Sequence, residues 1–449
     1  MFSKVLIANR GEIAVRIIRG CRELGVRTVA VFSEADRGAL HAQIADEAIC
    51  IGPAATKDSY LNAQAILAAC ELTGAEAVHP GFGFLSESAS FARMCERCGI
   101  TFIGPSAQSI ERMGDKAEAK RTMKNAGVPV IPGSDGVVKT TDEAIAIAEE
   151  IGYPVMVKAS AGGGGRGIRM VNTKSELEAA VTAAKQEALA FFGDDGVYIE
   201  KFIINPRHVE IQLLADQQGN VVHLGERDCS LQRRNQKVLE ESPSPIMTAE
   251  LRERMGEAAK KAAVACGYYN AGTVEFLVDE KENFYFMEMN TRIQVEHPIT
   301  ELVTGIDIVK QQLLIASGEP LAFTQSDIHL TGHAIECRVN AENPKFDFRP
   351  SPGRIEGLHM PGGPGVRIDS AVYQGYTIPP YYDSMIAKLI VCAPTRDEAI
   401  HKMKWALAEF LVEGIDTNID FQLNLVKDPD FEAGHYDIGF LGRRDLTKD

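Results

Sequence analysis

The segment Thr273-Val274-Glu275-Phe276-Leu277-Val278, followed after a polar turn by Phe284-Tyr285-Phe286-Met287-Glu288-Met289-Asn290, has the pattern of a β-hairpin. If Asp279 pairs with Phe284 around residues 280–283, Glu275 lies directly opposite Glu288, with the two Cβ atoms about 5 Å apart. Like charges placed in this way repel each other unless a cation lies between them. Two carboxylates and the Asn290 amide oxygen are hard ligands suited to Mg²⁺ or Mn²⁺. The hairpin therefore predicts a metal–nucleotide site with Glu275, Glu288 and Asn290 as metal ligands.

Length and charge restrict the class of protein. With 449 residues, 45% of them hydrophobic, the chain is long enough for two to four domains. Its net charge of −15 argues against nucleic acid and anionic membranes as partners, because both bind a surplus of Lys and Arg. We find no membrane-spanning apolar run and no targeting segment, and the nine cysteines are sparse and odd in number. These features favour a cytoplasmic protein with reduced thiols, in which Cys95 and Cys98 are ordinary helix thiols.

The first 114 residues alternate strand and helix patterns, which is typical of a doubly wound parallel-sheet domain. We expect strands at 4–8, 28–32, 75–79 and 101–103, and a helix at 11–24. The first turn, Ala8-Asn9-Arg10-Gly11-Glu12, lacks the G-x-G-x-x-G pattern, so dinucleotide binding is not expected here.

Residues 115–330 have a different, α+β texture. A hinge is expected at 128–133, where prolines and a glycine interrupt regular structure. A small module follows at about 133–203, with strands at 153–158, 167–171 and 197–200 and a helix at 175–190. A larger α+β region at 207–324 contains the hairpin. The last domain, 331–449, has strands at 333–339 and 388–392 and a helix opened by Thr395 and Glu398.

The loop Ala161-Gly162-Gly163-Gly164-Gly165-Arg166-Gly167 lies between two predicted strands. It is not a Walker A loop, because no Gly-Lys-Ser or Gly-Lys-Thr follows it. A glycine backbone can fold onto phosphates and donate its amide N–H groups, although a plain hairpin turn explains the glycines equally well. Lys158 ends the preceding strand and Lys116 ends the first domain, and either ammonium group could neutralise phosphate.

Charged residues gather after the hairpin. Glu288, Asn290 and Arg292 share one face if the strand continues, and Glu296 follows. In a later strand Glu336, Arg338 and Asn340 also share a face, which could equally be exposed. Between the loop and the hairpin, a basic group could hold an anion or decorate a turn: Arg227, Arg233, Arg234 and Lys237. His208 begins a strand, where a histidine is more often structural than functional.

A lysine before a glycine flap, an acidic hairpin and a downstream Arg/Glu cluster together resemble the ATP-grasp architecture. Longer strings make the chain similar to biotin carboxylase, the subunit of acetyl-CoA carboxylase, over essentially its whole length. They are Ile7-Ala8-Asn9-Arg10-Gly11-Glu12-Ile13-Ala14, His79 to Glu87, Gly162 to Gly167, Arg227 to Arg234 and Glu288 to Pro298. The resemblance implies an N-terminal Rossmann-like biotin carboxylase domain (1–114), an ATP-grasp domain (115–330) with a mobile lid (about 133–203) and a C-terminal biotin carboxylase domain (331–449).

The resemblance also implies site residues. The residues expected to bind ATP are Lys116, Lys158, Gly163, Gly164, Gly165, Glu200, Lys201, Ile203, His208, Gln232 and Asn235. Glu275, Glu288 and Asn290 are expected to ligate or support two Mg²⁺ or Mn²⁺ ions that bridge the phosphates.

The implied reaction is the carboxylation of biotin through carboxyphosphate. Lys237 and Arg292 would hold bicarbonate, and Glu296 would remove its proton. Arg338 would stabilise the enolate-like ureido oxygen of biotin. Residues near biotin would be Gln294, Val295 and Phe82.

Two positions depart from the family pattern: many relatives carry His where Asn235 stands, and Tyr is common where Phe82 stands. The chain lacks an Ala-Met-Lys-Met attachment signature, so biotin is expected to arrive on a biotin carboxyl carrier protein, with a carboxyltransferase completing the assembly. Family resemblance also suggests a homodimer. The final acceptor stays open between acetyl-CoA, pyruvate and other acids. Two alternative functions are an ATP-grasp ligase that joins a carboxylate to an amine, and a non-catalytic nucleotide sensor.

Overall fold

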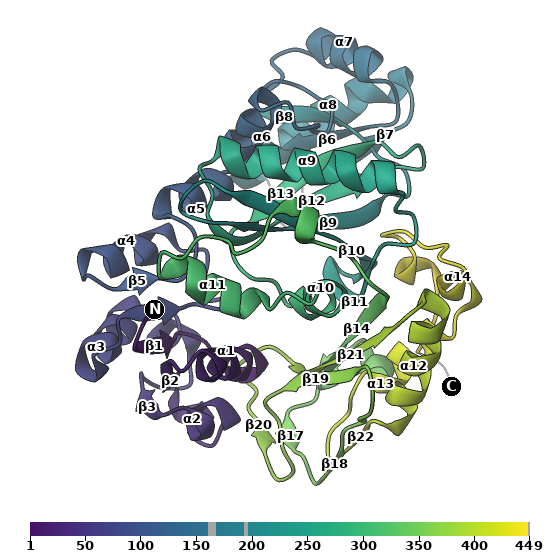
Figure 1. Cartoon of the computed structure of the whole chain (residues 1–449). Helices are drawn as coiled ribbons and strands as arrows, with labels where there is room; N and C mark the ends of the chain where they lie inside the picture. Colours follow the sequence, from purple (N-terminus) through teal and green to yellow (C-terminus); the bar gives the residue numbers. More distant parts are fainter. Residues whose placement is uncertain (160–167, 193–195, 448–449) are drawn as a thin grey trace. The chain divides into compact units, whose positions relative to one another are not determined.

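The computed structural model describes residues 1–159, 168–192 and 196–447 (Figure 1). The chain forms two compact units. The first unit consists of Met1–Val128, Arg207–Phe276 and Glu288–Asp449, and the second consists of Pro129–Pro206 and Leu277–Met287. Within the described residues no helix is long and apolar enough to cross a membrane.

The first unit begins with an all-parallel sheet in the order β3-β2-β1-β4-β5. Alternate residues of β1 face opposite sides: Val5 and Ile7 pack with residues of α1, whereas Leu6 packs with residues of α3 and α4. Helices therefore cover both faces, which confirms the predicted doubly wound fold. The bounds are β1 (Lys4–Ile7), β2 (Arg27–Phe32), β3 (Glu47–Cys50), β4 (Ala77–His79), β5 (Thr101–Phe102), α1 (Gly11–Glu23), α2 (Leu40–Ile44), α3 (Ala63–Thr73), α4 (Ala89–Arg97), α5 (Ala107–Gly114) and α6 (Lys116–Asn125).

A second sheet has eight strands in the order β13-β12-β9-β10-β11-β14-β21-β19. The ladders from β9 through to β19 are antiparallel. The strands are β9 (Arg207–Ala215), β10 (Val221–Arg233), β11 (Gln236–Ser242), β12 (Asn270–Val278), β13 (Phe284–Asn290), β14 (His333–Asn340), β19 (Val366–Ser370) and β21 (Met385–Ala393). Helix α9 (Ala249–Ala265) packs on β9 and β10, and helix α10 (His297–Thr304) packs on β11, β14 and β21. Helix α11 (Ile308–Ala316) follows α10.

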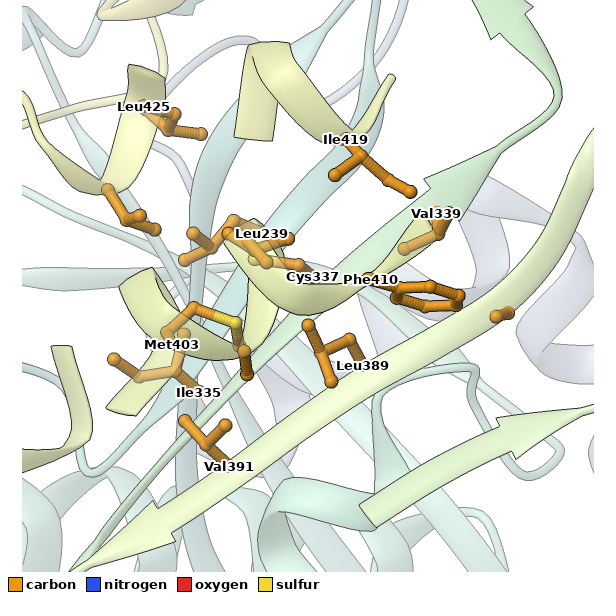
Figure 2. Packing of buried hydrophobic residues seen from close by; sticks show 14 of the residues in the cluster. Leu239, Ile335, Cys337, Val339, Leu389, Val391, Met403, Phe410, Ile419 and Leu425 are labelled. Atoms are coloured by element: carbon orange, nitrogen blue, oxygen red, sulfur yellow. The ribbon is translucent and has the colours of Figure 1, made fainter. Parts of the chain in front are cut away.

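The other face of β11, β14 and β21 is an apolar core. Residues with period two point into it, including Leu239, Ile335, Cys337, Val339 and Leu389 (Figure 2). Helix α12 (Arg396–Glu409) contributes Met403 and Leu407, and its N-cap Thr395 accepts a hydrogen bond from the Glu398 N–H. Further elements are α13 (Ile419–Val426), α14 (Pro429–Glu432) and the two-stranded pairs β15 (Glu342–Asn343) with β16 (Arg349–Pro350), β17 (Gly353–Arg354) with β20 (Thr377–Ile378), and β18 (Gly357–His359) with β22 (Leu411–Glu413).

The second unit has its own three-stranded antiparallel sheet of β6 (Val155–Ala159), β7 (Ile168–Val171) and β8 (Val197–Lys201), in the order β7-β6-β8. Helices α7 (Thr141–Ile151) and α8 (Lys174–Phe192) pack against it. Its core includes Val155, Val157, Leu177, Val181 and Ile199, all buried. The glycine-loop residues Gly163, Gly164 and Gly165 lie outside the described residues.

Candidate active site

The β12–β13 hairpin closes differently from the prediction. The Asp279 N–H donates to the Asn283 carbonyl at 2.9 Å, and the Glu282 N–H donates to the Asp279 carbonyl at 3.1 Å. Glu282 has φ 60°, a left-handed conformation that closes a three-residue turn. The predicted pairing of Asp279 with Phe284, which placed Glu275 opposite Glu288, is therefore wrong at the turn.

Acidic and amide side chains of the two hairpin strands nevertheless meet. The Asn290 amide nitrogen donates to Glu275 Oε1 at 2.8 Å. The pKa of Glu288 is raised by the dehydration of its carboxyl group and by the negative charge of Glu275, while Lys116 acts in the opposite direction. A divalent cation would relieve this repulsion, and the carboxylates offer the hard oxygen ligands that Mg²⁺ takes. The residues present thus fit a metal site.

Beside the hairpin, Lys237 of β11 is surrounded by carboxylates. Its Nζ donates to Glu210 Oε2 at 2.6 Å, to Glu275 Oε1 at 2.9 Å and to Glu296 Oε1 at 2.6 Å. Burial alone would lower the pKa of Lys237, but the anionic groups around it, with Cys229, raise that pKa well above its ordinary value. Lys237 is therefore a fixed positive charge at the centre of the site.

Glu296 is the N-cap residue of α10 and is almost completely buried. Its second oxygen, Oε2, accepts from the Arg338 guanidinium at 3.0 Å. Burial would raise the pKa of Glu296, but Lys237, Arg338 and Arg227 outweigh it and hold that pKa well below its usual range. Glu296 is therefore an ionised base enclosed by cations.

Arg338 of β14 is held by a second carboxylate, because its Nε donates to Glu240 Oε1 at 2.7 Å. Burial would lower the pKa of Arg338, but Glu240, Glu296 and Glu336 raise it. Sequence left open whether the strand face of Glu336, Arg338 and Asn340 is exposed; β14 is an inner strand of the sheet, and Arg338 and Asn340 are half-buried. Glu336 on this face is fully buried.

Strand β13 ends at Asn290, so the predicted continuation of this strand through Arg292 is wrong. Arg292 nevertheless lies beside the hairpin, since its guanidinium donates to Asn290 Oδ1 at 3.0 Å. Its Nε donates to Glu87 Oε2 at 3.0 Å, and the Thr291 N–H donates to Glu87 Oε1 at 3.1 Å. Glu87, to which sequence reasoning gave no role, fixes the position of Arg292.

Sequence left open whether the basic group of Arg227, Arg233, Arg234 and Lys237 holds an anion or decorates a turn. The structure divides this group, and Arg227 and Lys237 both bind Glu210. The fully buried Arg227 donates from Nε to Glu210 Oε1 at 2.6 Å, directly across the β9–β10 ladder. Arg233 and Arg234 instead bind Asp347. Glu210 binds both Arg227 and Lys237, so this ion pair helps to hold Lys237 in place. In the sequence, only the charged positions along the two strands could have indicated that Arg227 and Glu210 pair.

Several other predicted residues adjoin the same cluster. Gln294 Nε2 donates to Glu275 Oε1 at 2.9 Å, and Gln294 Oε1 accepts from Arg227. His208 Nε2 lies 3.0 Å from Glu275 Oε2, and His208 Nδ1 lies 2.7 Å from the Gln232 amide nitrogen.

Val295 accepts from Lys388 Nζ through its carbonyl at 2.8 Å. Asn235 lies in the β10–β11 turn with φ 63°. The Phe82 carbonyl accepts from the Asn9 amide at 2.7 Å. Lys116 is the first residue of α6 and is exposed.

In the second unit the Lys158 ammonium donates to Glu200 Oε2. Lys201 Nζ donates to the Gly152 and Tyr153 carbonyls, at 2.8 and 3.0 Å. Ile203 is buried. Lys158 and Glu200 thus form one ion pair diagonally across the β6–β8 ladder, with their side chains on the same face.

A buried base held between cations, next to an acidic hairpin that fits a metal ion, suits an enzyme that activates an anion. Three family models match successive parts of the chain: "Biotin carboxylase, N-terminal domain" at residues 1–110, "Carbamoyl-phosphate synthase L chain, ATP binding domain" at 115–324, and "Biotin carboxylase C-terminal domain" at 336–443. The chain belongs to the biotin carboxylase family.

Relatives support this assignment over the full length. "Biotin carboxylase 1" of Bacillus subtilis is 60% identical over 447 residues, which cover 99% of both chains. A pyruvate carboxylase subunit of Methanothermobacter thermautotrophicus is 57% identical over 98% of this chain and 90% of its own length. The dimeric biotin carboxylase domain of Hydrogenobacter thermophilus 2-oxoglutarate carboxylase, solved with MgADP, ADP and bicarbonate, is 53% identical with a TM-score of 0.89, covering 100% of this chain and 99% of that one.

Proposed function

We propose that this chain uses ATP and bicarbonate to carboxylate N1′ of biotin, releasing ADP and phosphate, as the first half-reaction of acetyl-CoA carboxylase. The observation that carries the proposal is the position of Glu296, a buried carboxylate that accepts from Lys237 at 2.6 Å and from Arg338 at 3.0 Å. A carboxylate kept ionised between two fixed cations can take a proton from an anion that the same cations attract.

In this proposal Lys237 and Arg292 bind bicarbonate and Glu296 removes its proton. The resulting oxyanion attacks the γ-phosphorus of ATP, ADP leaves, and carboxyphosphate forms. Glu210 holds the Lys237 ammonium in place through a hydrogen bond of 2.6 Å. Glu87 holds the Arg292 guanidinium in the same way at 3.0 Å. Because the positive charges are already oriented, little reorganisation accompanies the reaction.

Glu275 and Glu288, with the support of Asn290, are the proposed ligands of two Mg²⁺ or Mn²⁺ ions. When bound, such ions neutralise phosphate charge and orient the γ-phosphoryl group. Before they bind, Lys237 partly balances the charge of Glu275 at 2.9 Å.

Carboxyphosphate then yields CO₂ and phosphate, and the phosphate takes the N1′ proton of biotin. Arg338 stabilises the negative charge on the ureido oxygen, and the biotin nitrogen attacks CO₂. Gln294, Val295 and Phe82 are the proposed neighbours of biotin. Nucleotide binding is assigned, also as a proposal, to Lys116, Lys158, Gly163, Gly164, Gly165, Glu200, Lys201, Ile203, His208, Gln232 and Asn235.

The proposed partners are a biotin carboxyl carrier protein, a carboxyltransferase and a second copy of the chain, in the cytoplasm. Support for the homodimer comes from the dimeric Hydrogenobacter domain. The similarity to a pyruvate carboxylase subunit keeps pyruvate as the alternative final acceptor. Nine free cysteines agree with a reducing compartment.

Release of ADP from ATP, with and without bicarbonate and free biotin, tests the proposal. We expect ADP release that depends on bicarbonate and is stimulated by biotin. ADP release driven by a carboxylate and an amine would instead support an ATP-grasp ligase. Nucleotide binding without any turnover would support a sensor.

A further inference from the structure

The sheet face beneath α10 carries two acidic residues directly opposite each other. Glu240 of β11 and Glu336 of β14 are partners in the antiparallel ladder, and the Cβ atoms of such partners lie about 5 Å apart. Both residues are 0% exposed. Helix α10 closes this face, where its Ile299 packs with Ala334 and Ile390. The pair is therefore closed to bulk solvent.

The hydrogen bonds of the pair are incomplete. Glu240 Oε1 accepts from Arg338, but among the described residues Glu240 Oε2 and both oxygens of Glu336 have no hydrogen-bond partner. An ionised carboxylate without donors is costly to bury. The Arg338 guanidinium therefore binds only one of the two carboxylates, and it also donates to Glu296.

The charged groups that face the pair do not supply the missing donors. They are Lys237, Glu296, Arg338 and Lys388. His297 of α10, which packs on β11 and β14, is titratable, but burial lowers its pKa well below the ordinary value. Lys388 Nζ donates to the Val295 carbonyl at 2.8 Å and lies 3.1 Å from Glu12 Oε1. His297 Nδ1 lies 2.8 Å from the Gln294 carbonyl, and its Nε2 has no hydrogen-bond partner among the described residues. Neither His297 nor Lys388 donates a hydrogen bond to Glu336, whose two oxygens have no partner there.

We propose that Glu240 and Glu336 share a single proton, and that Glu240 is a positioning residue which holds the Arg338 guanidinium beside Glu296. The proton is bonded to one carboxyl group and donates a hydrogen bond to the other, so the pair carries one negative charge. This charge offsets that of Arg338. Burial and the negative charge of Glu296 raise the pKa of Glu240 to about 7, and burial and the negative charge of Glu240 raise the pKa of Glu336 well above its ordinary value. Both directions agree with a retained proton.

Infrared difference spectra of the full chain at neutral pH test the shared proton. We expect Glu240→Gln and Glu336→Gln each to remove the carbonyl stretch of one protonated carboxyl group, because the remaining carboxylate ionises beside Arg338. The exposed Glu250→Gln is the matched control and should leave the band intact. Loss of the band in only one variant, or in neither, would overturn the proposal.

Should a glutamine variant fail to fold, aspartate at the same position keeps a carboxyl group. A shift of the same band in both aspartate variants supports a shared proton, whereas a shift in one or in none contradicts it.

The positioning role rests on the proposed function of Arg338 and needs a kinetic test. We expect Glu240→Gln to lower biotin-dependent kcat about 10- to 100-fold while KM for ATP stays within about twofold, because only the orientation of Arg338 changes. Glu240→Asp should restore part of the rate. Equal losses in both variants, or an equal rise in KM for ATP, would contradict positioning. If the wild-type chain released no ADP with bicarbonate, the proposed function would fail, but the infrared result would still stand.

Discussion

At the scale of single residues, the site consists of charges that fix one another. Glu296 contacts Lys237 and Arg338, which are in turn held by Glu210 and Glu240. The resemblance named Glu296, Lys237 and Arg338 from sequence. It did not name Glu210 or Glu240, because these carboxylates reach the site only through strand pairing that local sequence does not record.

Glu296→Gln should abolish most carboxylation while nucleotide still binds. The amide keeps the shape of the side chain but cannot accept a proton, so we expect kcat to fall about 10²- to 10⁴-fold. Bicarbonate-dependent ADP release measures the first effect, and calorimetric titration with ADP measures the second. The control is the exposed Glu319→Gln, which should behave as wild type. A parallel loss of ADP affinity in Glu296→Gln would contradict the assigned role.

At the scale of elements, the alternation of β11 and β14 separates two environments. Odd-numbered residues such as Leu239 and Ile335 enter the apolar core in Figure 2, whereas Glu240 and Glu336 enter the charged face under α10. The period-two pattern of β14 could therefore be recognised in the sequence, where it predicts a strand at 333–339. The hairpin turn could not, because residues 280–283 contain no glycine and a left-handed glutamate such as Glu282 is uncommon.

Leu389→Ala in β21 should lower the free energy of unfolding by about 2–5 kcal/mol, because Leu389 is fully buried and the change leaves a cavity. Leu411→Ala is a matched control, since Leu411 is 57% exposed. Urea unfolding followed by circular dichroism compares the two variants. Equal effects would show that the core in Figure 2 is not packed as described.

Glu241 links three elements and should make stability depend on pH. It accepts from His333 of β14 at 2.6 Å, from Arg396 of α12 at 2.8 Å, and from Tyr436. Burial would raise its pKa, but His333 and Arg396 lower it from 4.5 to about 2. Because the folded-state pKa is depressed, the stabilisation is complete above the unfolded pKa and is lost as pH falls toward 2.

This carboxylate should contribute about 3 kcal/mol at neutral pH. We expect Glu241→Gln to be less stable than wild type at pH near 7 and to lose less stability on acidification. Urea unfolding at a series of pH values gives the free energy of unfolding of each protein as a function of pH. If this free energy fell equally with pH in wild type and in Glu241→Gln, the role assigned to Glu241 would be refuted.

At the scale of the whole molecule, the parallel N-terminal sheet could be predicted from patterning. The sequence analysis predicted α+β structure for the rest of the chain, but not that strands from 207–290 and 333–393 join in one eight-stranded sheet. Contacts between distant parts of the chain could not be predicted. One example is Lys388 Nζ of the C-terminal domain, which lies 3.1 Å from Glu12 Oε1 of the N-terminal domain. Such contacts join residues far apart in the chain, and hydrophobic periodicity carries no information about them.

Removal of divalent metal should stop turnover of the whole enzyme. Glu275 and the partly dehydrated Glu288 repel each other without a cation, and phosphate charge is then not neutralised. We expect a chelator to abolish bicarbonate-dependent ADP release and either Mg²⁺ or Mn²⁺ to restore it. Unchanged turnover after exhaustive chelation would exclude the acidic hairpin as a metal site.

The central claim is that the cluster around Glu296 activates bicarbonate for transfer to biotin. The most direct test is ATP-dependent transfer of isotopically labelled bicarbonate to biotin by the wild-type chain and by Glu296→Gln. We predict labelled carboxybiotin with the wild type, and at most about 1% of that rate with the variant. Absence of label with the wild type, or equal labelling by both proteins, would contradict the account.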